Sequence, residues 1–234
     1  MRVEETKYII ALSQIKGIGS AFIKKHLSFI KLNILSKKKL CELSVKINIA
    51  DLEDNYYSAN HILDDCEKYN ISTISIIEDG YPKLLLEIKD PPPVLYFKGN
   101  KDLLEKAIAI IGSRKSTDLG NKIANKVGEY FSKNWAICNG LVDGIDKNSI
   151  INDNGVFPNV IGVLSGGLNF HKTSSKITID LADKVLNNYG LLVSEYEPNK
   201  KEDQFSGSKA SRIQAGLSNS LILIQSSKNG GSKY

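Results

Sequence analysis

Residues 107–114 read Ala-Ile-Ala-Ile-Ile-Gly-Ser-Arg, and this stretch decides the fold. The five apolar residues at its start predict a buried β-strand. The glycine and the two polar residues after them predict a tight turn directly after the strand. Ser116, Thr117 and Gly120 follow where the next helix is expected to begin. The stretch is therefore typical of the first strand–turn–helix unit of an α/β domain.

Strands and helices are expected to alternate through the rest of the chain. Further strands are predicted at 135–138, 160–164, 191–194 and 220–224, with segments between them that are long enough for helices. This order predicts a doubly wound, mostly parallel sheet. Upstream, residues 90–100 read Asp-Pro-Pro-Pro-Val-Leu-Tyr-Phe-Lys-Gly-Asn, and their prolines exclude a helix. We therefore expect residues 90–100 to form a rigid extended segment that contains a short strand.

The first 70 residues are predicted to form a small helical domain of the helix-hairpin-helix or SAM-like kind. Apolar residues recur at helical spacing over 8–15 and again over 22–30. Gly17-Ile18-Gly19, between these two segments, resembles a hairpin whose backbone N–H groups could hold a DNA phosphate. A purely structural hairpin is an equally open alternative. Short strands and turns begin at Ile71, so the predicted domains are 1–70 and 71–234.

Charge and cysteine content narrow the class of protein. The net charge is +5, and between Thr6 and Cys41 there are eight lysines and no carboxylate. This segment is either a solvated helical surface or a phosphate-facing patch. No apolar run approaches the ~20 residues of a membrane span, and the amino terminus carries the acids Glu4 and Glu5, so a cytoplasmic protein without membrane association is predicted. Three widely spaced cysteines predict neither a disulfide framework nor a metal site.

The loops that follow the predicted strands are the candidate binding site. In such sheets ligands bind beyond the carboxyl ends of the strands. Glycine lets a phosphate approach the backbone, and hydroxyl groups can donate hydrogen bonds to it. The guanidinium of Arg114 can donate two parallel hydrogen bonds to phosphate oxygens. A single glycine can equally be a simple turn. The predicted phosphate-binding residues in these loops are Gly112, Ser113, Arg114, Ser116, Thr117, Gly140, Gly144, Gly166 and Gly167, with a similar loop at 230–232.

Enzymatic signatures are missing from these loops. No Gly-x-Gly-x-x-Gly follows the first core strand, and there is neither a Gly-Lys-Ser/Thr phosphate loop nor a Gly-x-Ser-x-Gly elbow. The three histidines lie far apart in the sequence. Asp146 and Glu195 could form a carboxylate pair, although a helix cap and an internal hydrogen-bond acceptor are the preferred roles. We therefore predict no catalytic residues, no cofactor and no metal.

The order of these motifs resembles the DprA/Smf family of DNA-processing proteins. The resemblance runs from about Ile71 to the end of the chain. It rests on segments 80–85, 90–100, 109–114, 140–146, 194–196 and 212–218. The Pro-Pro-Pro-Val-Leu-Tyr lead-in followed by Gly-Ser-Arg is its most specific part.

The resemblance implies an extended Rossmann-like domain that binds single-stranded DNA without sequence preference. It also implies transfer of that strand to a RecA-type recombinase in natural transformation, and a homodimer. Ser113 and Arg114 would bind phosphates, and Arg212 would add a second cation to the same edge of the sheet. Such binding needs phosphate contacts rather than contacts to base edges.

This sequence departs from the family pattern at several of the same loops. Asn139 stands where the family has serine, Val142 where it has alanine, and Ser149-Ile150 where it has Ala-His. The family's Arg-Asn-Arg is reduced to Ala-Ser-Arg at 210–212, a loss of charge for which nearby Lys209 is expected to compensate in part. Residues 165–172 also diverge, and the C-terminal end is expected to be short, which puts the dimer in doubt.

Three functions follow from the sequence. The first is the single-strand binding that the resemblance implies. The second is a nucleotide-ligand sensor, in a regulatory or phage-defence setting, that uses the same phosphate pocket. The third is an enzyme that cleaves a nucleotide's glycosidic or phosphate bond with Asp146 or Glu195.

Overall fold

The computed structural model describes residues 2–203 and 205–226, and the chain separates into two compact units, Met1–Tyr96 and Phe97–Tyr234. The boundary between the units falls inside a strand. The predicted domain boundary at 70/71 lies between the last long helix of the first unit and its first strand. Each unit is described by itself.

The first unit begins with helices, as the sequence predicts. Its elements in chain order are α1 (Arg2–Gln14), α2 (Ser20–Lys25), α3 (Leu27–Asn33), α4 (Lys37–Cys41), α5 (Ile49–Lys68), β1 (Ser72–Ser75), α6 (Lys83–Glu87) and the start of β2 (Val94–Gly99). Helices α1 and α5 pack together around the fully buried side chains of Ile9, Leu12 and Leu52. The helix expected over 22–30 is broken at His26, whose backbone is not helical (φ −104°, ψ 17°).

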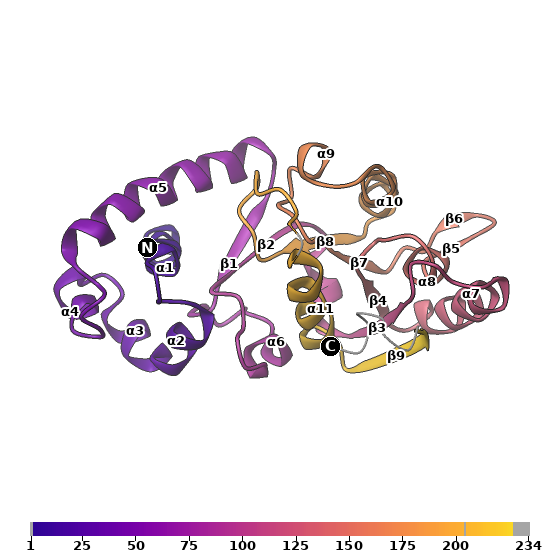
Figure 1. Ribbon diagram of the computed structural model, residues 1–234, viewed down its shortest axis with the longest axis horizontal. Coiled ribbons are helices and arrows are strands. Elements are labelled where there is room, and N and C mark those ends of the chain that lie inside the picture. The colour runs from indigo at the N-terminus through magenta and orange to yellow at the C-terminus, as the bar shows by residue number, and fades with distance from the viewer. Residues whose placement is uncertain (1, 204, 227–234) are drawn as a thin grey trace. The chain divides into compact units, whose positions relative to one another are not determined.

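The second unit alternates strands and helices, as Figure 1 shows. After β2 its elements are the 3₁₀ helix η1 (Lys101–Glu105), β3 (Ala107–Gly112), α7 (Asp118–Ser132), β4 (Ala136–Asn139), α8 (Ile145–Asn148), β5 (Ile151–Asn152), β6 (Gly155–Val156), β7 (Val160–Val163), α9 (Phe170–Thr173), α10 (Lys176–Asn187), β8 (Leu191–Ser194), α11 (Ser206–Gly216) and β9 (Ser220–Gln225). The five core strands begin and end within one residue of their predicted positions.

The core strands of the second unit are parallel and lie in the order β8-β7-β4-β3-β9. Every residue of β4, β7 and β8 is buried, which explains why these strands are apolar runs rather than alternating ones. The mostly parallel α/β sheet predicted from the sequence is therefore confirmed.

The strand order places the topological switch point between β3 and β9. From β3 the chain adds β4, β7 and β8 on one side, and β9 then returns to the other side of β3. Ligands of doubly wound sheets bind beyond the carboxyl ends of the strands at such a point. The predicted Gly-Ser-Arg loop leaves β3 there. Within the described residues, no helix combines the length and hydropathy that a membrane span requires.

Candidate functional site

The candidate site lies at the carboxyl edge of the parallel strands, within the second unit. Hydrogen bonds join the loops that leave neighbouring strands. The amide of Ser113 donates to the carbonyl of Gln225 (2.7 Å), and the amide of Ile145 donates to the carbonyl of Ser113 (3.2 Å). The amide of Gly167 donates to the carbonyl of Lys200 (2.8 Å). We call this edge of joined loops, together with α11, the rim.

Arg114 is an exposed cation on the rim. Within the described residues its guanidinium makes no hydrogen bond and no ion pair. It lies beside the first turn of α11, because a Cβ atom placed on Gly207 would stand 3.8 Å from Nη2 of Arg114. Lys115, next in the chain, is also exposed. The guanidinium is therefore free to receive an anion from solvent.

The hydroxyl groups of the first loop bond within the protein. Ser113 Oγ donates to the carbonyl of Lys115 (3.0 Å), and Ser116 Oγ donates to Asn121. Thr117 caps α7 by accepting from the amide of Gly120, and its own amide donates to Oε1 of Gln225 (3.0 Å). The amide oxygen of Gln225 thus occupies the N-terminus of α7 at the switch point, a role that sequence reasoning missed. The sequence signal that could have indicated this role is the polar residue Gln225 at the end of β9, the strand beside β3.

The five predicted glycines are packing positions between loops. Gly144 has φ +83°, and a Cβ there would lie 2.2 Å from the carbonyl oxygen of Ser113. A Cβ on Gly167 would lie 2.0 Å from the carbonyl oxygen of Glu197. The glycines therefore let one loop lie directly on another. Side-chain or backbone atoms also stand within 3.2 Å of a Cβ built on Gly112, Gly140 and Gly166.

The carboxylate of Asp146 lies inside the rim and is 4% exposed. Its Oδ2 accepts from the amide of Gly140 at 2.9 Å. Burial raises the pKa of Asp146 from 3.8 to about 7, opposed by the amides of Gly140, Val142 and Gly112 and by the charge of Arg114. The loop amides that a phosphate would need are therefore directed at the protein's own carboxylate.

Two residues that depart from the family pattern, Asn139 and Ser149, form a hydrogen bond with each other. Asn139 Nδ2 donates to Ser149 Oγ (3.1 Å) and to the carbonyl of Asp146 (3.0 Å), and all three residues are buried. Asparagine for serine at 139 and serine for alanine at 149 thus keep the buried polar atoms hydrogen-bonded. These departures preserve the loop that holds Asp146.

The two predicted cations of α11 have different environments. Arg212 is held by Glu195 in a bidentate ion pair, with N–O distances of 3.0 and 2.6 Å. Lys209 is exposed, and its Nζ lies 5.9 Å from the ring centre of Tyr196. Phe205, at the start of the helix, is 62% exposed and was not anticipated. The loop at 230–232 lies outside the described residues.

The lysine-rich segment of the first unit is partly committed to internal contacts. Lys24 donates to the carbonyls of Glu87 and Ile88, and Lys31 pairs with Asp79 at 2.8 Å. Lys7 and Lys37 also pair with carboxylates, whereas Lys16, Lys25, Lys38 and Lys39 are exposed. In the Gly17-Ile18-Gly19 turn, both glycines are exposed and the isoleucine is buried. Four of the eight lysines are thus engaged within the unit, and the other four are exposed.

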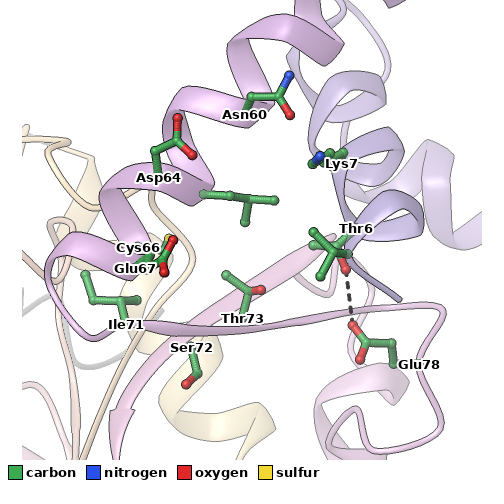
Figure 2. Close-up of a pocket in the computed structure, with 12 residues that line it drawn as sticks. Thr6, Lys7, Asn60, Asp64, Cys66, Glu67, Ile71, Ser72, Thr73 and Glu78 are labelled. Atoms are coloured by element: carbon green, nitrogen blue, oxygen red, sulfur yellow. Dashed lines mark hydrogen bonds between the residues drawn. The ribbon is translucent and has the colours of Figure 1, made fainter. Parts of the chain in front are cut away.

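A cavity of about 470 Å³ lies in the first unit, between α1, α5 and β1 (Figure 2). Its lining is largely polar, and Thr6 donates to Glu78 at one side of it. The three cysteines are free, and the described residues contain no cluster of three metal-ligating side chains.

Comparisons with known proteins agree with this geometry. The sequence profile of the family described as DNA recombination-mediator protein A matches residues 72–234. The DNA processing protein DprA of Bacillus subtilis is 33% identical over 185 residues, which are 78% of this chain and 61% of that protein. Protein Smf of Synechocystis is 27% identical over an alignment of 247 positions that covers 99% of this chain and 61% of that protein. The chain thus spans about three fifths of the length of these two relatives.

Two solved structures are similar to this one. The X-ray structure of DprA from Streptococcus pneumoniae matches with a TM-score of 0.79 and 28% identity, over 97% of this chain and 80% of that one. The structure of Helicobacter pylori DprA, whose description concerns its single-stranded DNA binding mode, matches with a TM-score of 0.60 and 26% identity, over 69% of this chain and 72% of that one. Since the family profile covers well over half of the sequence, the chain belongs to the DNA recombination-mediator protein A family, the DprA/Smf family that its motifs resemble.

Proposed function

We propose that the chain binds single-stranded DNA through phosphate contacts to the rim cations, which are Arg114, Lys115 and Lys209. The observation that carries this proposal is the exposed Arg114 guanidinium, which makes no hydrogen bond and no ion pair with the described residues. A planar guanidinium matches the oxygens of a phosphate, and lysines add sequence-independent attraction. These contacts suit a backbone of any sequence.

An exposed aromatic ring beside the rim cations supports a single strand rather than a duplex. Phe205 is 62% exposed and precedes Gly207, the residue beside Arg114, by two positions. Unpaired bases can stack on such a ring, whereas the bases of a duplex are already stacked. The Helicobacter pylori relative, described as a single-stranded DNA binder, is consistent with this choice.

The other two functions have less support. A nucleotide sensor would place phosphates on the loop amides and on the N-terminus of α7. Asp146 and Gln225 use those positions. The enzyme alternative would use Asp146 or Glu195, but Asp146 is buried and accepts from the amide of Gly140, and Glu195 is bound to Arg212. We therefore propose a DNA-binding protein and not an enzyme.

The proposal extends to the partners expected from the family. Transfer of the bound strand to a RecA-type recombinase in natural transformation, and action as a homodimer, are supported by family membership.

Binding to fluorescent oligo-dT, measured by anisotropy at low salt, tests the proposal. We expect single strands to bind more tightly than a duplex of equal length. Arg114→Glu should weaken binding by about 10- to 100-fold, because it removes a charge-assisted contact worth about 1.5–3 kcal/mol. Lys133→Glu is the matched control, since this exposed lysine lies at the other end of α7. Equal loss in both variants, or a wild-type protein that does not bind, would refute the proposal.

A further inference from the structure

The guanidinium of Arg212 has its donors engaged within the protein. Its Nη1 donates to Oε1 of Glu195 (3.0 Å) and to the carbonyl of Lys209 (2.8 Å), and its Nη2 donates to Oε2 of Glu195 (2.6 Å). The two side chains are only 21% and 12% exposed. Arg212 would have to leave a largely buried ion pair before it could bind a phosphate, and breaking such a pair is costly.

Glu195 is itself held in place by the end of β8. The preceding residue, Ser194, donates its hydroxyl to the carbonyl of Gly166 (2.8 Å), and the amide of Tyr196 donates to the hydroxyl of Ser194 (3.0 Å). The carboxylate is thus presented from a strand end on which the Gly166 loop is already fixed. The carboxylate of Glu195 is therefore a rigid acceptor for the two terminal nitrogens of the Arg212 guanidinium.

The ion pair therefore joins α11 to the sheet at the place where α11 supplies the rim. Lys209 lies one turn before Arg212 and reaches over the ring of Tyr196. Gly207, in the first turn, lies beside Arg114. A rotation or shift of α11 would move Lys209 and change the surroundings of Arg114 together.

We infer that the Glu195–Arg212 ion pair is a positioning device that sets α11 in the rim, and that Arg212 is not a phosphate ligand. The DNA part of this inference rests on the proposed function. The positioning part concerns the folded chain alone and can be measured without DNA.

Glu195→Gln distinguishes a role of Arg212 in positioning α11 from a role as a phosphate ligand. The substitution removes the acceptor charge and releases the guanidinium. If Arg212 were a phosphate ligand, binding to oligo-dT would become tighter. The positioning role predicts weaker binding, by about 3- to 10-fold, for both Glu195→Gln and Arg212→Gln. It also predicts that the two variants change the dependence of affinity on salt equally, because both displace Lys209, whereas a phosphate contact of Arg212 itself would be lost only in Arg212→Gln and would reduce the slope by about 0.7 in that variant alone.

Hydrogen exchange and a charge swap complete the test. We expect faster amide exchange in α11 for both single variants, and a return toward wild-type exchange and affinity in Glu195→Arg/Arg212→Glu. Ala215→Gly, at an exposed position of the same helix, is the control for general helix weakening and should leave DNA affinity unchanged.

Three results would overturn the inference: unaltered exchange in α11, tighter DNA binding by Glu195→Gln, or a salt slope that is reduced in Arg212→Gln but not in Glu195→Gln. A wild-type protein that fails to bind DNA would defeat the proposed function. The exchange measurements would still decide whether the ion pair positions α11.

Discussion

Residues of the same chemical type have different roles on the rim. Arg114 is exposed and makes no ion pair with the described residues, whereas Arg212 is bound to Glu195. Asp146 is likewise a carboxylate at a candidate binding loop, yet it is buried and accepts from the loop's own amide. Residue type and position in the sequence identified all three, but only the structure shows which partner each has. The burial of Asp146 has a consequence for the pH dependence of stability.

Asp146→Asn should alter that pH dependence in a defined direction. Because burial raises the pKa of Asp146 from 3.8 to about 7, the folded chain holds a proton that the unfolded chain releases between these values. Its contribution to stability is present at low pH and is lost as the pH rises toward 7, by at most about 1.4 kcal/mol per pH unit.

Urea unfolding of wild type and Asp146→Asn at pH 5, 6, 7 and 8 measures this effect. The wild-type stability should fall relative to that of the variant up to about pH 7 and run parallel above it. Asp143→Asn, an exposed carboxylate three residues away, is the control and should not change the pH profile in this window. Parallel profiles for wild type and Asp146→Asn would show that the carboxyl group is not protonated in the folded chain.

At the scale of elements, the glycines of the rim determine how closely its loops pack. Gly144→Ala places a methyl group against the Ser113 carbonyl in a backbone conformation that favours glycine. We expect a loss of about 1–3 kcal/mol in stability. Binding of oligo-dT should also weaken, because the loop that carries Arg114 must move.

Gly19→Ala is the matched control for this substitution. Its φ is −93°, and no atom lies within 4 Å of the added Cβ, so its effect should stay within about 0.5 kcal/mol. Thermal unfolding of both variants measures the difference in stability, and anisotropy of Gly144→Ala against wild type measures the change in DNA affinity. If Gly144→Ala were as stable as Gly19→Ala, the close packing of the loops would be refuted.

The strands were predictable from the sequence because each is a short apolar run between turn residues. The break at His26 was not, because the helical spacing of apolar residues continues across it. The loops of the rim were also located correctly, since each directly follows a strand. Their packing was not predictable, because the contacts of Gly144 with Ser113 and of Gln225 with Thr117 join segments distant in sequence.

For the whole molecule, net charge alone does not identify the proposed DNA-binding surface. The chain carries +5, and this excess lies in the second unit, because residues 1–96 contain 13 basic and 13 acidic side chains. Within the first unit, Lys24 and Lys31 are also engaged by carbonyl and carboxylate groups of the same unit. The rim of the second unit combines an exposed guanidinium, exposed lysines and an exposed aromatic ring. We therefore expect the rim to account for the salt dependence of DNA binding.

The slope of log affinity for oligo-dT against log salt concentration, compared between wild type and Arg114→Ala, tests this claim most directly. Each phosphate contact on a single strand contributes about 0.7 to the slope. Loss of the Arg114 contact should therefore lower the slope by about that amount, whereas Lys133→Ala should leave it unchanged. An Arg114→Ala slope equal to that of wild type would contradict the account, because it would mean that no phosphate lies on this guanidinium.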